Sequence, residues 1–408
     1  MRLLFVVQRY GAEVIGGAEL ACRQFATHLA ERGHVVHALT SCAVGYEEWA
    51  DVYPPGSSAV DGVTVHRLPV VRRRDPISFG RLDQRTVWSR GVHPLVLERA
   101  WMEAQGPVLA GQARWLRGAA ASYDVVVFFT YLYRTTWIGL PVAAPLVPTV
   151  LHPTAHQEPH FNLALFDTML RLPTAYAYFT EEEAQLIAVR TGTPRSGRVV
   201  GIGSDLAIVG SGDRFRRATG LGSRPYVLFV GRVVAEKGSL ELYDYFVAYK
   251  RRCPGPLALV IVGDPLSDVP AHPDVVTMGY VTESVKADAM AGALALAQPS
   301  YFESFSLVLS EAWAQGTAAL VQGHCDVLAG QVSRSGGGIA YRGYAEFEAA
   351  VDLLLAEPAL GPTLGARGRA YVARRYSWDA VLRRYERLLG ETAGRWAAAR
   401  VLAARLPA

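Results

Sequence analysis

The chain has 408 residues, which is too long for one ordinary hydrophobic core and fits two domains of about 200 residues each. Half of the residues are hydrophobic and 19% are charged, a balance that excludes a chain disordered by composition. The net charge of +4 is too mild for a nucleic-acid-binding protein, which would present a concentrated basic face.

Neither the cysteines nor the apolar segments indicate secretion or a membrane span. The four cysteines lie far apart without a Cys-x-x-Cys pair, which is typical of a reducing compartment rather than a zinc site or a disulfide framework. The apolar N-terminal segment gives way to Gln8 and Arg9 sooner than a secretory segment would, and no apolar run reaches about 18 residues. We therefore expect a cytoplasmic protein.

The first half alternates between strand and helix patterns. Residues 3–7 form a continuous apolar run, which predicts a strand buried on both faces. A glycine-rich stretch follows, and a helical pattern then runs from 18 to about 32, with Gly33 placed to end it. Further strands are predicted at 34–40, 63–68, 124–129 and 147–151.

The same alternation restarts in the second half, and it predicts a parallel sheet covered by helices in each half. The segment 195–222 is dense in Gly, Ser and Arg, which indicates a boundary there. We expect domains at 1–200 and 201–385 and a C-terminal helix over 386–408 that packs back over them. Strands of the second half are predicted at 225–231, 257–263, 275–280 and 293–300.

Two glutamates stand eight residues apart in YFESFSLVLSEAWAQG. On one continuous helix they would lie about 80° apart and more than two turns distant, so they would not act together. If Glu303 lies in a loop and a helix begins near Ser306, the backbone N–H groups of Phe305, Ser306 and Leu307 open the helix and can hold a phosphate. Taken alone, Glu303 and Glu311 would more often be ordinary residues of an amphipathic segment.

The segment GRVVAEKGSL follows a predicted strand and places Arg232 and Lys237 beside a glycine turn. A diphosphate leaving group needs cations to neutralise the charge that develops as its bond breaks. Each cation considered singly is equally compatible with a solvated surface.

This combination resembles glycosyltransferase family 4, whose GT-B fold has two Rossmann-like domains facing a central cleft. The resemblance spans the second half through VGRVVAEKG, VIVGDP, GYVTE, AQPSYFESFSLVLSEAWAQG and YSWDAVLRRYERLL. It implies that the N-terminal domain binds the acceptor and the C-terminal domain binds the donor. Arg232 and Lys237 would contact the donor diphosphate, Glu303 would bind hydroxyls of the transferred sugar, and Glu311 would bind the nucleotide ribose.

The resemblance also implies donor contacts at the loop and helix start formed by Ser304, Phe305, Ser306 and Leu307. Ser304 and Ser306 stand where family members commonly carry glycine, so donor choice is expected to shift. Thr317 stands where proline is common, with an effect expected on loop stiffness alone.

The first half matches the family more loosely. GGAEL resembles the family's glycine loop, in which Gly16 and Gly17 would let the backbone approach the donor phosphates. His152 follows a strand, as does the family's histidine near the transferred sugar, and would be catalytic. In VGIGSD, Gly203 would approach the donor, whereas Asp205 is expected to be structural.

The sequence has three histidines at intervals of four residues, a spacing compatible with a metal site: His152, His156 and His160. Pro153 and Pro159 would break the helix that could align them, so no metal site is expected. His156 and Glu158 are second choices for acceptor contacts, and ordinary loop polarity is slightly favoured for both. The run Arg72-Arg73-Arg74 usually marks a solvated loop, with an acidic acceptor or an anionic membrane surface as the alternative.

The resemblance implies a retaining, metal-independent hexosyltransferase without a cofactor. The sugar would pass from a UDP- or GDP-sugar to a hydroxyl of a glycan, a lipid-linked or a small-molecule acceptor by front-face displacement. One alternative is another GT-B enzyme, such as a nucleotide-sugar epimerase or a phosphorylase. The other is a non-catalytic nucleotide-sugar binding subunit, which the presence of both cations and both glutamates disfavours.

Overall fold

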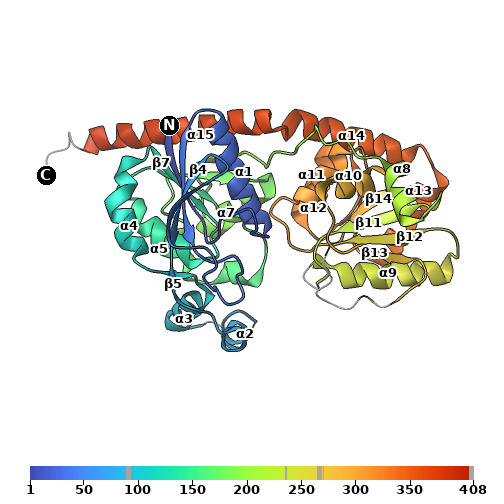
Figure 1. The fold of residues 1–408 in the computed structure, drawn as a ribbon, viewed down its shortest axis with the longest axis horizontal. Coiled ribbons are helices and arrows are strands. Elements are labelled where there is room, and N and C mark those ends of the chain that lie inside the picture. Colours follow the sequence, from blue (N-terminus) through green and yellow to red (C-terminus); the bar gives the residue numbers. More distant parts are fainter. Residues whose placement is uncertain (89–92, 235–236, 264–268, 270, 404–408) are drawn as a thin grey trace. The chain divides into compact units, whose positions relative to one another are not determined.

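The computed structural model of the protein describes residues 1–88, 93–234, 237–263, 269 and 271–403. The chain folds into two compact units, one formed by Met1–Val200 with Leu382–Ala408 and the other by Gly201–Val381. Each unit has its own largely parallel sheet with helices on both faces (Figure 1). The prediction of two Rossmann-like α/β domains is therefore confirmed.

Unit 1 is built on an eight-stranded sheet in the order β10-β9-β8-β7-β1-β2-β4-β3. Its central strand, β1, comes from the first apolar run, and Leu3 to Val6 are fully buried because helices cover both faces. All pairs in this sheet are parallel except β3 with β4, which forms a hairpin that the sequence analysis missed. The strands are β1 (Arg2–Val6), β2 (Val35–Ser41), β3 (Gly56–Val60), β4 (Val63–Leu68), β7 (Val125–Phe129), β8 (Thr149–His152), β9 (Ala175–Tyr178) and β10 (Gly197–Val199).

The helices of unit 1 begin and end at recognisable sequence signals. The first one ends before Gly33, which has φ 88°, as predicted from the glycine. The hydroxyl of Thr180 caps a later helix by accepting a hydrogen bond from the Glu183 backbone N–H. The helices are α1 (Gly17–Glu31), α4 (Gln112–Ala119), η2 (Ala120–Ser122), α5 (Arg134–Ala143), η3 (Pro159–Asn162), α6 (Phe166–Met169) and α7 (Glu181–Thr191).

After β4 the chain leaves the sheet and forms a segment in which no strand was predicted from the sequence. It forms a two-stranded antiparallel sheet and a short helical excursion, seen beside the α2 and α3 labels in Figure 1. Its elements are β5 (Val70–Arg72), α2 (Pro76–Asp83), η1 (Gln84–Trp88), α3 (Leu95–Gln105) and β6 (Val108–Leu109).

Unit 2 has a six-stranded, wholly parallel sheet in the order β13-β12-β11-β14-β15-β16. The strands predicted in this half are present, although the one expected over 275–280 ends at Thr277. The strands β15 and β16 were not among the predictions. The strands are β11 (Tyr226–Val230), β12 (Ala258–Val262), β13 (Val275–Thr277), β14 (Ala295–Gln298), β15 (Ala319–Gln322) and β16 (Gly338–Tyr341).

Helices cover the sheet of unit 2 on both faces, with α9 on one side and α10, α11 and α12 on the other (Figure 1). Side chains from β11, β12, α9 and α13 form a continuous apolar core under the sheet. The helices are α8 (Gly212–Thr219), α9 (Ser239–Arg252), α10 (Glu283–Ala291), α11 (Leu307–Ala314), α12 (Asp326–Ser335), α13 (Tyr344–Ala356) and α14 (Leu360–Arg375).

The last helix, α15 (Trp378–Ala403), includes the tail expected to be helical over 386–408, of which residues 404–408 lie outside the described part. From Leu382 onward the helix belongs to unit 1. Its Arg384 donates a hydrogen bond to the Val200 carbonyl, and its Glu386 pairs with Arg32 at 2.8 Å.

Candidate active site

A polar cluster of unit 2 lies at the carboxyl edge of its sheet, where β11 and β14 are neighbours. Because the chain leaves β11 for β12 on one side and β14 lies on the other, this is the topological switch point at which open α/β sheets bind ligands. Lys237 comes from the loop after β11, and Glu303 comes from the loop after β14. The Lys237 Nζ lies 2.8 Å from Glu303 Oε1. The structure thus brings together two residues predicted from separate motifs.

A glycine allows this close approach of the two loops. Gly238 has φ 66°, a left-handed backbone that favours glycine. A Cβ at this position would lie 2.3 Å from the Pro299 carbonyl oxygen, which is too close for any side chain. Gly238 therefore lets the loop after β11 pack directly against the end of β14, and this contact places Lys237 beside Glu303.

Gln298, the last residue of β14, organises the loop that carries Glu303. Its buried Nε2 donates hydrogen bonds to Glu303 Oε1 and to Ser306 Oγ, each at 3.0 Å. Sequence reasoning missed this residue, although a polar side chain at the end of an apolar strand was an available signal. Ser306 has φ 71°, a left-handed backbone uncommon outside glycine, which accounts for the glycine that the resembled family carries there.

Helix α11 begins at Leu307, close to the start predicted near Ser306. The side chain of Ser306, the residue before the helix, makes no capping hydrogen bond, so the first backbone N–H groups of the helix can donate to an anion. The ring of Phe305 is buried and packs edge-on against Tyr376, and the Phe305 carbonyl accepts a hydrogen bond from Gln331. Any contact between Phe305 and a ligand therefore comes from its backbone.

The remaining donor-site predictions of unit 2 lie in the same two loops. Arg232 follows β11 by two residues and is exposed, and Ser304 is partly buried next to Glu303. Their contacts with a diphosphate stay predictions. Residues 235–236 of the VGRVVAEKG motif and 264–265 of the VIVGDP motif lie outside the described part of the chain.

Glu311 is one turn into α11 and faces the neighbouring helix α10. Its Oε2 is buried and lies 2.9 Å from Lys286 Nζ. Lys286 also lies 2.7 Å from Glu283, one turn earlier on α10. Burial alone would lower the Lys286 pKa, but the carboxylates of Glu311 and Glu283 outweigh burial and raise the pKa, so the side chain is a firmly held cation.

The glycine loop of unit 1 is tied to a buried ion pair. Arg9 Nη2 lies 2.6 Å from Glu19 Oε1, and both side chains are 6% exposed. Gln8 donates a further hydrogen bond to the same oxygen at 2.8 Å. A Cβ at Gly16 would lie 2.3 Å from Glu19 Oε2, whereas a Cβ at Gly17 would meet open space. Packing against Glu19 thus explains why position 16 is a glycine. The approach of Gly16 and Gly17 to a donor stays a prediction.

His152 is the last residue of β8, and its ring is fully buried. The ring stacks on Phe129 with centroids 4.1 Å apart, lies against Phe25 and Phe179, and shares a 2.9 Å hydrogen bond through Nε2 with Tyr385 Oη. Burial lowers the His152 pKa well below its usual value, so the ring is neutral. The ring is thus enclosed by side chains of unit 1, and the catalytic role of His152, through its ring or its backbone, stays a prediction.

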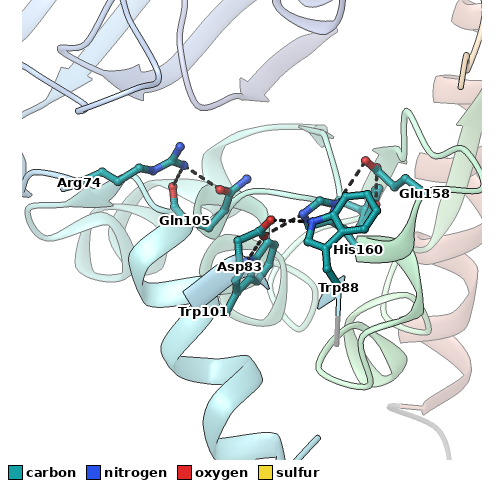
Figure 2. A network of polar contacts seen from close by, with 8 residues as sticks. Arg74, Asp83, Trp88, Trp101, Gln105, Glu158 and His160 are labelled. Atoms are coloured by element: carbon teal, nitrogen blue, oxygen red, sulfur yellow. Dashed lines mark hydrogen bonds and ion pairs between the residues drawn. The ribbon is translucent and has the colours of Figure 1, made fainter. Parts of the chain in front are cut away.

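The third histidine of the spaced series, His160, sits between two carboxylates (Figure 2). Its Nε2 lies 2.9 Å from Asp83 Oδ1, and its Nδ1 lies 3.6 Å from Glu158 Oε2. Asp83 also accepts hydrogen bonds from the indole N–H groups of Trp88 and Trp101, at 3.0 and 2.7 Å. The network fastens the helical excursion of unit 1 to the loop after β8. Glu158 is thus held by contacts within unit 1, which agrees with the interpretation that it is an ordinary polar residue of this loop.

Stability of unit 1 is expected to depend on pH through His160. Burial alone would lower its pKa, but the hydrogen bonds and attraction to Asp83 and Glu158 raise the pKa to about 9. The pKa of His160 is higher in the folded than in the unfolded protein. Its stabilisation of the folded state is therefore complete below about pH 6.5 and is lost as the pH rises through the folded pKa. It amounts to about 3 kcal/mol at its full extent.

This contribution can be measured by urea unfolding of wild type and His160→Gln at pH 6, 7.5 and 9.5. We expect the gap in unfolding free energy between the two proteins to be largest at pH 6 and to shrink toward pH 9.5. His28→Gln, which alters a partly exposed ring paired with the exposed Glu31, serves as the control. A gap for His160→Gln that grows with pH would contradict the assignment.

Gly203 packs against a ring of its own unit. The residue is buried, and a Cβ there would lie 2.1 Å from the Trp378 ring. Packing within unit 2 therefore explains the glycine, and the approach of Gly203 to a donor stays a prediction. Asp205 forms a local turn by accepting a hydrogen bond from the Ala207 backbone N–H at 2.9 Å, which is the structural role expected of it.

In the part of the chain that the structure describes, no group of three or more His, Cys, Asp or Glu side chains is arranged to hold a metal ion. None of its helices combines the length and apolar character needed to cross a membrane.

Comparison with known proteins agrees with this geometry. Residues 224–357, which include β11, β14 and both predicted cations and glutamates, match the family model described as glycosyl transferases group 1. The prediction of a glycosyltransferase with the GT-B fold is confirmed. The chain is 27% identical to a D-inositol 3-phosphate glycosyltransferase of Mycobacterium marinum, over 93% of this chain and 83% of the relative. It is 24% identical to a glycogen synthase of Mycobacterium tuberculosis, over 93% and 92% of the two chains.

Solved structures share the fold of this glycosyltransferase at low sequence identity. The sucrose-phosphate synthase of Thermosynechococcus elongatus superposes with a TM-score of 0.69 at 18% identity, covering 98% of this chain and 99% of the other. Anabaena Alr3699/HepE, solved in complex with UDP and glucose, superposes with a TM-score of 0.67 at 17% identity, covering 96% and 100%. At these identities the likeness establishes the architecture.

Proposed function

We propose that this glycosyltransferase is a retaining enzyme of family 4 that transfers a hexose from a nucleoside diphosphate sugar to an acceptor hydroxyl. The observation that carries the proposal is the pair of Lys237 and Glu303, 2.8 Å apart at the switch point of unit 2. A cation and a carboxylate meeting beside an uncapped helix start offer one group for a diphosphate and another for sugar hydroxyls.

The proposed mechanism relies on position and charge. Lys237, Arg232 and the backbone N–H groups at the start of α11 stabilise the diphosphate as it leaves, and no metal ion is needed for that neutralisation. Glu303 accepts hydrogen bonds from hydroxyls of the transferred sugar and fixes its orientation. A phosphate oxygen of the donor takes the proton of the acceptor hydroxyl on the same face, so the anomeric configuration is retained.

A uridine nucleotide is the first choice for the donor, ahead of a guanosine nucleotide. Anabaena Alr3699/HepE was solved with UDP-glucose, and a trehalose-6-phosphate enzyme of E. coli was solved with UDP-2-fluoro glucose, both on this fold. The acceptor is a hydroxyl of a glycan, a lipid-linked sugar or a small molecule, bound by the variable loops of unit 1. The reaction is placed in the cytoplasm, where the four free cysteines stay reduced.

A thermal-shift screen against UDP, GDP, ADP and dTDP, each with and without EDTA, tests the proposal. A ligand that binds only the folded state stabilises it by about 2.7 kcal/mol at a hundredfold excess over Kd, which raises the melting temperature of a unit of this size by roughly 5 °C or more. We expect one nucleotide, UDP first, to give this shift unchanged by EDTA.

Other outcomes of the screen are equally informative. A shift abolished by EDTA would contradict the metal-free mechanism. The absence of a shift with all four nucleotides at millimolar concentration would contradict the donor site. In a separate assay, binding of the matching sugar nucleotide without release of nucleoside diphosphate, either to water or to any glycan, lipid-linked or small-molecule acceptor offered, would indicate a non-catalytic binding subunit.

A further inference from the structure

Glu311 has one carboxylate oxygen turned inward. Oε2 is buried, whereas the side chain as a whole is 30% exposed. The inward oxygen lies 2.9 Å from Lys286 Nζ on the neighbouring helix α10. One ammonium group therefore fixes which oxygen of Glu311 faces α10 and restrains the carboxylate as a whole.

Lys286 itself is not placed to bind a ligand. Its side chain is 18% exposed, and its ammonium group lies within 2.9 Å of both Glu311 and Glu283. The two carboxylates differ in environment, because the Glu283 side chain is 71% exposed and the Glu311 side chain is 30% exposed. An exposed ion pair contributes little, so the contact that constrains Lys286 is the one with Glu311.

We propose that Lys286 is the positioning residue for nucleotide recognition: it holds Glu311 as an oriented carboxylate whose outer oxygen accepts hydrogen bonds from the ribose hydroxyls of the donor. This inference rests on the proposed function, in which Glu311 binds the ribose. A carboxylate held by a neighbouring ammonium group loses little rotamer freedom when the nucleotide binds, and a carboxylate oxygen forms strong, charge-assisted hydrogen bonds with hydroxyls. Removing the ammonium group would free the side chain and weaken the ribose contact while leaving the diphosphate contacts in place.

The test compares the affinities of UDP and 2′,3′-dideoxy-UDP in wild type and in Lys286→Met, by calorimetric titration. Wild type is expected to prefer UDP by about tenfold or more. The dideoxy analogue lacks both ribose hydroxyls, so it leaves the outer oxygen of Glu311 without their hydrogen bonds. In Lys286→Met this preference is expected to fall to about twofold, while the affinity for the dideoxy analogue stays the same. With the sugar nucleotide, KM should rise and kcat at saturating donor should stay near the wild-type value.

Three further variants separate positioning from a general structural role. Glu283→Gln removes the other partner of Lys286 and is expected to keep the wild-type preference. Lys286→Arg restores a cation and is expected to recover most of the preference. Glu311→Gln keeps the shape but removes the charge, and it is expected to lose the preference as Lys286→Met does. Lys286→Gln, which removes the charge but keeps a polar side chain, replaces Lys286→Met as the decisive comparison if that variant does not fold.

Failure of this inference is distinguishable from failure of the proposed function. If wild type binds no nucleoside diphosphate, both are overturned. If wild type binds UDP and its dideoxy analogue equally, or if Lys286→Met folds and keeps the full preference for UDP, the positioning role is overturned and the donor site stands.

Discussion

Replacing Lys237 with methionine is expected to lower the turnover of the sugar nucleotide by about 10²–10³-fold, because one of the groups that neutralise the departing diphosphate is lost. In the structure the Lys237 ammonium lies 2.8 Å from Glu303 Oε1, beside the start of α11. Turnover is measured as release of nucleoside diphosphate by hydrolysis of the donor, in which water takes the sugar, so that the acceptor need not be known.

The variant is expected to fold, so the loss can be assigned to chemistry. The Lys237 side chain is 35% exposed, and an ion pair of this exposure contributes at most about 1 kcal/mol to stability. Arg251→Met, which removes an exposed cation from the last turn of α9, is the matched control and is expected to keep wild-type turnover. Unchanged turnover in Lys237→Met would remove this residue from the mechanism.

Replacing Glu19 with alanine is expected to destabilise unit 1 by about 3–5 kcal/mol, because it leaves a buried arginine without its counter-charge. Arg9 and Glu19 are each 6% exposed, and Arg9 donates to Glu19 Oε1 through both Nε and Nη2. Urea unfolding measures the loss, with Glu31→Ala as the control on the same helix, since the Glu31 side chain is 62% exposed.

A double variant separates the lost pairing from lost packing. Arg9→Met combined with Glu19→Leu replaces both charges by apolar groups, and it is expected to be more stable than Glu19→Ala because no charge is left buried alone. A Glu19→Ala variant as stable as the Glu31→Ala control would show that the pair does not hold the glycine loop.

The sequence predicted the candidate site best where its residues lie in short motifs at the ends of predicted strands. Lys237 and Glu303 were predicted from two motifs at strand ends, and parallel strand ends share one edge of a sheet, so their meeting in unit 2 follows from the alternation of strands and helices. The start of α11 was predicted within a residue or two for the same reason, since a loop glutamate followed by an apolar helical run leaves few places for the helix to begin.

Most of the contacts that the sequence did not predict depend on packing between distant segments. The enclosure of His152 by Tyr385 joins residues 233 positions apart, and the contact of Gly203 with Trp378 is also long-range, so neither could be read from local spacing. Lys286 carries no motif and gains its place only because α10 packs beside α11. The antiparallel hairpin of β3 with β4 was missed because Gly56–Val60 is short, exposed and rich in serine, unlike a buried parallel strand.

The measurement that tests the donor site most directly is the affinity of the nucleoside diphosphate for wild type and for Lys237→Met by calorimetric titration, with EDTA present. If the diphosphate lies at the edge formed by β11 and β14, wild type binds it without metal and the variant binds it at least about tenfold more weakly. Equal affinities in two folded proteins would show that the diphosphate is held elsewhere and would contradict the proposed site.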